Sequence, residues 1–273
     1  MPKLVVMLRV KNGAPFVHQW LACYEKLADE IVVLDNGSTD GTDVVLKNHP
    51  KVVDLISTQG YNEGRDKNLL YNRVRLRQPE WCLWVDIDEI FEPAVTRKHL
   101  DRLMSSRLAT RFSFRRFHFI DLHHFAASWF RLNYTAGPDR LLWKEHPAGY
   151  FEDKILDSPN VKGISGLKLP TTYRIMHLGY VSKDLVEQKA ALYNGLIAPE
   201  KAYNIQGMYM HNERKLRWHN NRFDPRVMGI NALLTTLMMR QWIIKAWRLV
   251  RAGAAENVAS DMQQDAHTKT KAA

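Results

Sequence analysis

Four acidic residues follow an apolar run in the segment 83–93, LWVDIDEIFEP. The acids are Asp86, Asp88, Glu89 and Glu92. A pair of carboxylates spaced like Asp86 and Asp88 can approach one hard divalent cation, which takes oxygen ligands and can also hold a diphosphate. Acids that only form a solvated turn at the end of a strand are the alternative interpretation. Asp86 and Asp88 are therefore the first candidates for a metal and diphosphate site.

The elements that must position these acids alternate along the first part of the chain. Apolar runs predict strands at 3–10, 30–34, 52–57 and 81–85, and helical spacing predicts helices at 15–27, 41–48 and 64–77. Unbroken apolar strands separated by helices are typical of a parallel sheet covered on both faces. We therefore expect an α/β fold with a doubly wound, mostly parallel sheet, followed by a helix at 96–107 and a strand at 109–119.

Three polar segments each follow the end of an expected strand. They are RVKNG at 9–13, LDNGSTDGT at 34–42 and VDIDE at 85–89. In an open α/β sheet, ligands bind beyond the carboxyl ends of the strands. The three segments are therefore expected to meet at one crevice.

Taken together, these segments resemble the nucleotide-sugar-dependent glycosyltransferases of family 2, which have the GT-A fold. The family carries a V-D-D-G-S-x-D-G-T segment followed by a D-x-D motif, and the resemblance covers about residues 4–92. The first motif differs, because Arg9, Val10 and Asn12 stand where the family commonly has proline, tyrosine and asparagine. Asn36 replaces the second aspartate of the second motif.

The resemblance implies roles for individual residues. Asp35 would contact the base of the donor nucleotide, and Val10 and Asn12 belong to the donor-binding segment. Asp86 and Asp88 would hold Mn²⁺ or Mg²⁺ bound to the diphosphate of a nucleoside diphosphate sugar.

The segment 61–71, YNEGRDKNLLY, begins the expected helix before the D-x-D strand. Helix N-termini attract anions. Arg65 and Lys67 would add positive charge near the diphosphate or the sugar, and Asp66 would accept hydrogen bonds from donor hydroxyls. An amphipathic helix with a solvated charged face is the other interpretation.

Acceptor chemistry is expected in the second half. The resemblance implies a carboxylate after the D-x-D that acts as general base on the acceptor hydroxyl, often within a Glu-Asp pair. Glu152 and Asp153 form such a pair, so Asp153 is the preferred base and Glu145 the alternative. Surface acids in a loop would have the same pattern.

Histidines supply candidates for a third metal ligand. His177 lies at the end of a short apolar run, shortly before a glycine. Imidazole is a suitable ligand for such metals. His123 and His124, after Asp121, are a second candidate. A structural role is the alternative for each.

Residues 229–251 form a basic amphipathic pattern. On a helical wheel the residues Arg240, Gln241, Lys245, Arg248 and Arg251 share one arc, opposite Trp242, Ile243 and Val250. Such a helix either lies on an anionic membrane surface or packs its apolar face on the enzyme core. The expected domains are a catalytic domain at 1–200, divided at residue 92 into donor and acceptor halves, a helical extension at 201–252 and a disordered tail at 253–273.

Composition limits the class of protein. The net charge of +10 suggests an anionic partner, the two cysteines are far apart, and no apolar stretch is long enough to span a membrane. No nucleic-acid recognition motif is present. We expect a cytoplasmic protein, held peripherally at the inner membrane face if the basic helix binds lipid.

The leading hypothesis is a metal-dependent inverting glycosyltransferase of the hexosyltransferase type. It would move a sugar from a nucleoside diphosphate sugar to a hydroxyl of a glycan or glycolipid, in polysaccharide or glycolipid assembly. A nucleotidyltransferase on a related sheet and a non-catalytic membrane- or nucleic-acid-binding protein are the alternatives.

Overall fold

The structure is a computed structural model that describes residues 3–127, 140–156, 160–196 and 214–218. The basic helix expected at 229–251 and the tail at 253–273 lie outside these residues. Of the helical extension expected at 201–252, the described residues include a strand at Arg214–Arg217. The predicted domain boundaries stay predictions.

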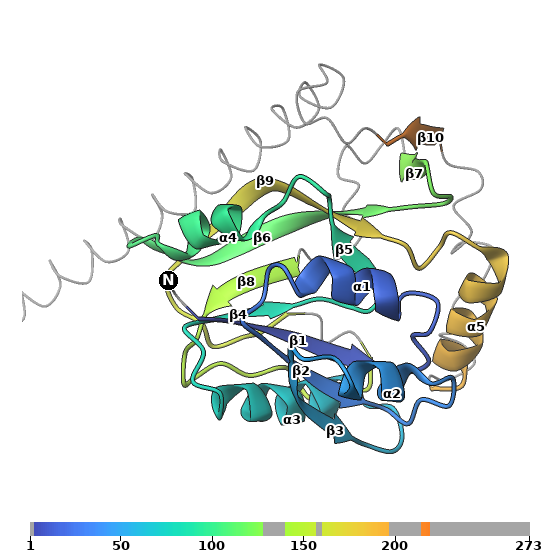
Figure 1. Ribbon diagram of the computed structural model, residues 1–273, viewed down its shortest axis with the longest axis horizontal. Coiled ribbons are helices and arrows are strands. Elements are labelled where there is room, and N and C mark those ends of the chain that lie inside the picture. The colour runs from blue at the N-terminus through green and yellow to red at the C-terminus, as the bar shows by residue number, and fades with distance from the viewer. Residues whose placement is uncertain (1–2, 128–139, 157–159, 197–213, 219–273) are drawn as a thin grey trace, which may run out of the picture. The chain divides into compact units, whose positions relative to one another are not determined.

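An eight-stranded sheet forms the centre of the described chain (Figure 1), with the order β3-β2-β1-β4-β8-β6-β9-β5. Its strands are β1 (Leu4–Val10), β2 (Glu30–Asp35), β3 (Val52–Ser57), β4 (Trp81–Trp84), β5 (Glu89–Phe91), β6 (Ala109–His118), β8 (Arg140–Lys144) and β9 (Leu167–His177). The pairs β2–β3, β1–β2, β1–β4 and β6–β9 are parallel, whereas β4–β8, β6–β8 and β5–β9 are antiparallel. The prediction of a mostly parallel sheet is confirmed.

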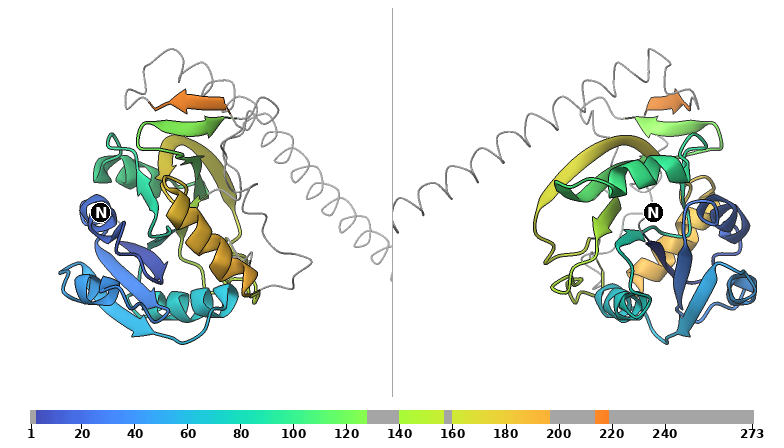
Figure 2. Two further views of the ribbon diagram at one scale, coloured as in Figure 1. Left: turned by 90° about the vertical axis from the view of Figure 1, so that its right-hand side faces the viewer. Right: turned by 60° about the vertical axis from the view of Figure 1, so that its left-hand side comes forward.

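Helices cover both faces of this sheet, as Figures 1 and 2 show. They are α1 (Val17–Tyr24), α2 (Thr42–Lys47) and α4 (Arg97–Met104) on one face and α3 (Glu63–Arg75) on the other. A fifth helix, α5 (Lys183–Asn194), lies beside the edge of the sheet. A separate pair of antiparallel strands is formed by β7 (His124–Ala127) and β10 (Arg214–Arg217). The α/β architecture with helices on both faces is therefore confirmed.

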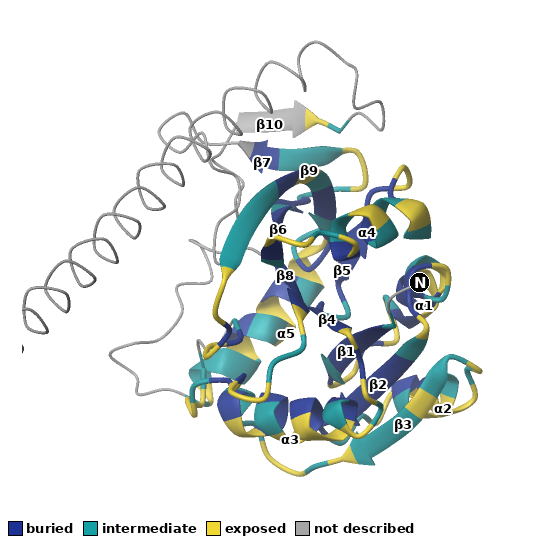
Figure 3. Ribbon diagram, turned by 90° about the vertical axis from the view of Figure 1, so that its left-hand side faces the viewer, coloured by how far each residue is buried: buried dark blue, intermediate teal, exposed yellow. Residues whose placement is uncertain are grey.

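Alternation along the strands divides the core into two layers. Leu4, Val6 and Leu8 of β1 pack with apolar residues of α1, α2 and α4 in one cluster. Val5 and Met7 pack with residues of α3 in a second cluster on the other face. Both faces of the strand are buried (Figure 3), which explains why its sequence is an unbroken apolar run.

The topology brings the ends of β1, β2 and β4 together, because these three strands are neighbours and run in parallel. The polar loops that follow them therefore share one edge of the sheet. Cys23 and Cys82 are both free thiols. In the part of the chain that the structure describes, no helix has the length and apolar character needed to cross a membrane.

Candidate active site

A pocket of about 320 Å³ lies at this edge of the sheet. It is lined by the end of β1 with the loop after it, the residue that follows β2, residues at the start of α3, the β4–β5 turn, Gly179 and one face of α5. The predicted residues Val10, Asn12, Asp86 and Asp88 are all part of the lining. The structure therefore brings the first and third polar segments together, as the sequence predicts.

Asn12 fixes the loop after β1 against the loop after β2. It has a φ of 54°, in the left-handed region that asparagine tolerates better than most residues. Its backbone N–H donates to Ser38 Oγ at 2.9 Å, and its Oδ1 accepts from the Thr39 backbone N–H at 2.8 Å. Asn12 thus contributes to the pocket wall and holds the two loops in register.

Asp35 shapes the turn after β2. It is buried, and its Oδ2 accepts from the backbone N–H groups of Gly37 at 3.0 Å and Ser38 at 2.9 Å. The Ser38 hydroxyl donates to the other oxygen. The residue of this segment that lines the pocket is Asn36, the neighbour of Asp35.

Asp66 lies behind the pocket and is fully buried. It accepts from Asn36 Nδ2 at 2.9 Å and from Arg65 Nε at 2.9 Å, and Arg9 Nη1 lies 3.5 Å from it. Arg65 also donates to the carbonyls of Gln59 and Gly60. Neither Asp66 nor Arg65 is part of the pocket lining. Asp66 contacts the lining residues Asn36 and Arg9, and Arg65 contacts Asp66.

The first turn of α3 does not offer free N–H groups to an anion. The backbone N–H of Glu63 donates to the Ile155 carbonyl at 3.0 Å, and that of Gly64 donates to the Lys154 carbonyl at 2.8 Å. The Arg65 N–H donates to the cap residue Asn62 at 2.9 Å. The geometry therefore does not support the anion site that the sequence places at this helix start.

Arg9, which departs from the family motif in sequence, is a residue of the pocket lining. Its guanidinium lies 4.2 Å from the centre of the Tyr61 ring, and Nη2 donates to the Tyr61 hydroxyl at 2.6 Å. Nη1 donates to Asn36 Oδ1 at 3.2 Å. These contacts hold a positive charge at the wall formed by β1 and α3.

The four acids of the opening segment divide into two pairs. Glu89 and Glu92 are buried and ion-paired with arginines, Glu89 with Arg116 and Arg140 and Glu92 with Arg174. Burial alone would raise the pKa of Glu89, but Arg140 and Arg116 hold that pKa far below its usual range. These two glutamates stabilise the sheet rather than face the pocket.

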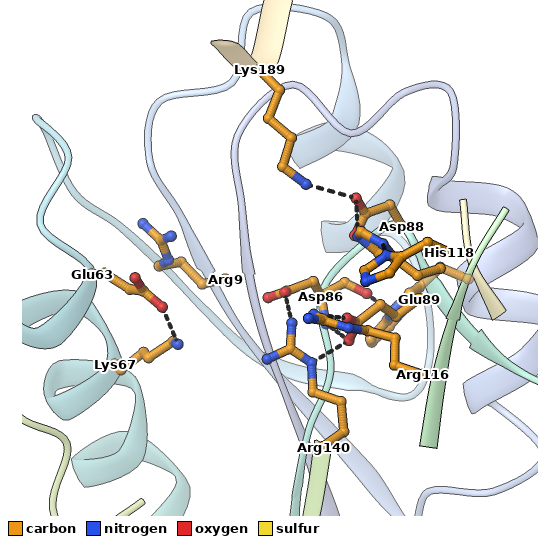
Figure 4. A network of polar contacts seen from close by, with 12 residues as sticks. Arg9, Glu63, Lys67, Asp86, Asp88, Glu89, Arg116, His118, Arg140 and Lys189 are labelled. Atoms are coloured by element: carbon orange, nitrogen blue, oxygen red, sulfur yellow. Dashed lines mark hydrogen bonds and ion pairs between the residues drawn. The ribbon is translucent and has the colours of Figure 1, made fainter. Parts of the chain in front are cut away.

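Asp86 and Asp88 face the pocket, each with a cationic partner (Figure 4). Asp86 is paired with Arg140, and its side chain is 37% exposed. Asp88 is more buried, and its Oδ2 lies 3.3 Å from Lys189 Nζ and 3.1 Å from His177 Nε2. Burial would raise the pKa of Asp88, but Lys189 and His177 outweigh it and hold that pKa well below its usual value.

His177 lies directly behind Asp88. It is buried, and burial lowers its pKa, although Asp88 acts in the opposite direction. Its Nδ1 is 2.6 Å from Nδ1 of His118, the last residue of β6. His123 and His124 lie instead at the start of β7, where His124 Nδ1 contacts Asp121 Oδ1 at 2.9 Å, and neither lines the pocket.

Comparison with known sequences identifies the family. The profile described as "Glycosyl transferase family 2" matches residues 10–154, more than half of the chain. The chain belongs to glycosyl transferase family 2. The matched region contains every residue of the pocket that precedes α5 except Arg9 and Gly179.

Individual relatives are distant. Uncharacterized proteins of Mycobacterium bovis and Mycobacterium tuberculosis are each 28% identical over 98 residues, which is 33% of this chain and 24% of those proteins. The alignment thus spans about a quarter of these relatives' length. Among solved structures, S. aureus TarS is 16% identical, with 76% of this chain and 70% of that chain covered and a TM-score of 0.43. The mannosyltransferase PcManGT from Pyrobaculum calidifontis, solved with GDP-Man and Mn²⁺, is 16% identical over 93% of this chain and 80% of that chain, with a TM-score of 0.44.

The two candidate bases lie apart from each other. Glu145 accepts from the Tyr71 hydroxyl and from Arg75 Nε, and its backbone N–H donates to the Glu80 carbonyl, just before β4 begins. That position is at the opposite end of β4 from Asp86, so Glu145 lies away from the pocket. Asp153 is exposed, and its backbone packs on Gly64 in the first turn of α3.

Several residues that line the pocket were not predicted from the sequence. They are Lys11, Tyr61, Glu63, Lys189 and Tyr193. Glu63 is ion-paired with Lys67, which is itself buried with Nζ 4.3 Å from the centre of the Trp84 ring. A signal for α5 was present, because Ser182 is a favourable N-cap residue and its hydroxyl accepts from the Leu185 N–H at 3.3 Å.

Proposed function

We propose that this glycosyltransferase is a metal-dependent, inverting enzyme that transfers a hexosyl group from a nucleoside diphosphate sugar to a hydroxyl acceptor. The observation that carries the proposal is the pocket at the carboxyl ends of β1 and β4, which combines the carboxylates Asp86 and Asp88 with the cations Arg9, Lys11 and Lys189. This combination suits a diphosphate and its divalent cation. The family match favours glycosyl transfer over the nucleotidyltransferase and non-catalytic alternatives.

The carboxylates of Asp86 and Asp88 fit Mn²⁺ or Mg²⁺ by type, and a neutral imidazole is a ligand that suits Mn²⁺ better than Mg²⁺. Asp86, Asp88 and His177 would hold the metal. Across the described ranges, no three His, Cys, Asp or Glu side chains already form a ready metal site. Arg140 and Lys189 hold the two carboxylates in their place. When bound, the metal would supply positive charge to the departing diphosphate.

The protein's own groups would bind and orient the donor. Arg9 and Lys11 offer positive charge to the diphosphate, while Tyr61 and Tyr193, whose ring centres are 6.4 Å apart, provide apolar surface for a nucleobase. Asp35 would act on the nucleobase indirectly. It shapes the turn that presents Asn36 to the pocket.

The general base is assigned to Asp153, as the sequence predicts. In an inverting transfer, one carboxylate removes the proton of the acceptor hydroxyl while that oxygen attacks the anomeric carbon, and the diphosphate leaves from the opposite side. The location of Asp153 beside the first turn of α3, next to the pocket residue Glu63, supports this assignment. The acceptor would be a glycan or glycolipid hydroxyl in polysaccharide or glycolipid assembly.

The experiment is a screen of nucleoside diphosphate sugars for Mn²⁺-dependent binding and hydrolysis. Asp86→Asn and Asp88→Asn should each abolish the response to the donor that binds the wild type. Asp54→Asn, which removes a carboxylate paired with Arg73 outside the pocket, should retain it. Donor binding that persists in both pocket variants would contradict the proposed metal site.

We also propose that residues 229–251 attach the enzyme to an anionic membrane surface. The support is the sequence pattern alone, in which Lys245 and Arg248 share the basic arc opposite Trp242. Each such cation contributes about 1 kcal/mol near an anionic surface. Replacing Lys245 and Arg248 by Glu should abolish sedimentation with phosphatidylserine vesicles at low salt while donor binding is unchanged. Unaltered sedimentation would rule out this attachment.

A further inference from the structure

One face of α5 forms a wall of the pocket. Leu185, Gln188, Lys189, Leu192 and Tyr193 line it, and these positions follow the spacing of a single helical face. Lys189 is the one cation that α5 contributes to the lining. Its Nζ points to the acidic turn between β4 and β5 (Figure 4).

Lys189 contacts the carboxylate that the proposed metal would need. Its Nζ is 3.3 Å from Asp88 Oδ2, the same oxygen that lies 3.1 Å from His177 Nε2. The Asp88 and Lys189 side chains are only 10% and 24% exposed, so water screens the pair weakly. A divalent cation and an ammonium group at contact distance from the same carboxylate repel each other, so Lys189 on Asp88 would compete with the metal.

On the basis of the proposed function, we propose that Lys189 occupies the metal's place on Asp88 in the free enzyme and moves to the donor diphosphate when the metal binds. The Lys189 ammonium group would thus pair with the Asp88 carboxylate in the free enzyme and with the diphosphate after the donor binds. The long, flexible lysine side chain permits this movement without a shift of α5. Lys189 would be a donor-binding residue that also keeps the site neutral when it is empty.

The surroundings of Asp88 favour such an exchange. A side chain on Gly179 would lie 2.2 Å from Asp88 Oδ2, so only glycine leaves that oxygen room. In the free enzyme Asp88 Oδ2 also lies 3.1 Å from His177 Nε2, so Lys189 is one of two partners of that oxygen. Asp86 has its own partner in Arg140, and Glu63 has Lys67, so their charges do not depend on Lys189.

The test measures metal and nucleotide binding separately, so it does not depend on turnover. Mn²⁺ binding without nucleotide would be followed by electron paramagnetic resonance, and binding of nucleoside diphosphates with Mg²⁺ by calorimetry. The variants are Lys189→Met, Lys189→Arg and the control Lys183→Met. Lys183 is on the same helix but outside the pocket, with a side chain that is 72% exposed and ion-paired with Glu187.

The proposal predicts opposite changes in Lys189→Met. Mn²⁺ alone should bind at least about 5-fold more tightly, because a competing charge is gone. The nucleoside diphosphate should bind about 10-fold or more weakly, the loss expected for one charge-assisted hydrogen bond. Lys189→Arg should restore nucleotide binding, and Lys183→Met should change neither affinity.

Two results would overturn the proposal and leave Lys189 as a structural partner of Asp88. One is that the affinities for Mn²⁺ and for the nucleoside diphosphate change in the same direction. The other is unchanged nucleotide binding in a folded Lys189→Met. Thermal melting of each variant shows whether it is folded. If Lys189→Met is not, Lys189→Gln, which also removes the charge, carries the same two expectations. A wild type that binds no nucleoside diphosphate would instead overturn the proposed function itself.

Discussion

The Nδ1 atoms of His118 and His177 lie 2.6 Å apart, so one nitrogen is protonated and donates a hydrogen bond to the other. His177 Nε2 faces the Asp88 carboxylate, which only accepts hydrogen bonds when ionised. A neutral His177 must therefore carry its proton on Nε2 and accept at Nδ1 from His118. This tautomer points a proton, not a lone pair, at the proposed metal position.

Binding of a metal to His177 Nε2 would reverse this arrangement. The His177 proton would then lie on Nδ1, and His118 would accept it. We predict that nitrogen-15 spectra of labelled histidines show both tautomers switching when Mg²⁺ and a nucleoside diphosphate are added. Unchanged His177 tautomers in the loaded enzyme would return this residue to a structural role.

Gly179 offers a test of how closely the position of Asp88 is controlled. In Gly179→Ala the new methyl group would meet Asp88 Oδ2 at 2.2 Å, and a flexible carboxylate would move aside. Because displacements of about 1 Å can lower rates by about 100-fold, we expect a loss of turnover of this order with little change in melting temperature.

The matched control is Gly195→Ala at the C-terminal end of α5, where the added methyl group would meet only ordinary contacts at 3.5 Å. It should retain wild-type turnover. Equal turnover of the two glycine variants would show that the position of Asp88 is not critical.

The base assignment predicts a split between affinity and rate. Asp153→Asn should lower turnover by about 100-fold or more while donor affinity stays within about 2-fold, because the amide keeps the shape but cannot take the proton. Glu145→Gln should retain turnover and instead lower stability, since Glu145 is bonded to Tyr71 and Arg75. An active Asp153→Asn together with an inactive Glu63→Gln would move the base to the pocket residue Glu63.

The sequence predicted the first half of the sheet closely. The strand Val52–Ser57 has the predicted bounds, and the strands on either side of it in the chain differ by a residue or two. β2 and β4 are buried along almost their whole length, whereas β3 is an edge strand whose residues are half-buried or exposed. A local apolar run bounded by helices was enough to predict all three strands. The position of β8 between β4 and β6 was not predicted, because antiparallel insertion depends on contacts between distant residues. α5 was also not predicted, since only Val186 and Ala190 on it are buried.

The site was predictable only in part. The position of Asp86 and Asp88 in the lining followed from their place after a buried strand. The partners of the acids did not, because Arg140 and Lys189 reach them from elements far along the chain. Asp35 and Asp66 illustrate the same limit: their types suited ligand binding, yet turn and side-chain contacts use their oxygens.

Lys67 leads to a prediction about pH and stability. Burial lowers its pKa to about 8, although Glu63 and Asp86 act in the opposite direction. In the unfolded chain a lysine has a pKa near 10.4, so between about pH 8 and pH 10.4 the unfolded state binds more protons than the folded state. The folded state therefore gains stability from this residue as the pH rises through that window. In total the gain is about 3 kcal/mol.

Chemical denaturation of the wild type and Lys67→Met, compared from pH 7.5 to pH 10.5, isolates this contribution, because other groups titrate equally in both proteins. The wild type should gain stability relative to Lys67→Met by a few kcal/mol across the range, with most of the change above pH 8, where the folded-state pKa lies. A difference in unfolding free energy that is constant with pH would show that Lys67 titrates normally, and its ion pair with Glu63 would then offset the cost of burial in full.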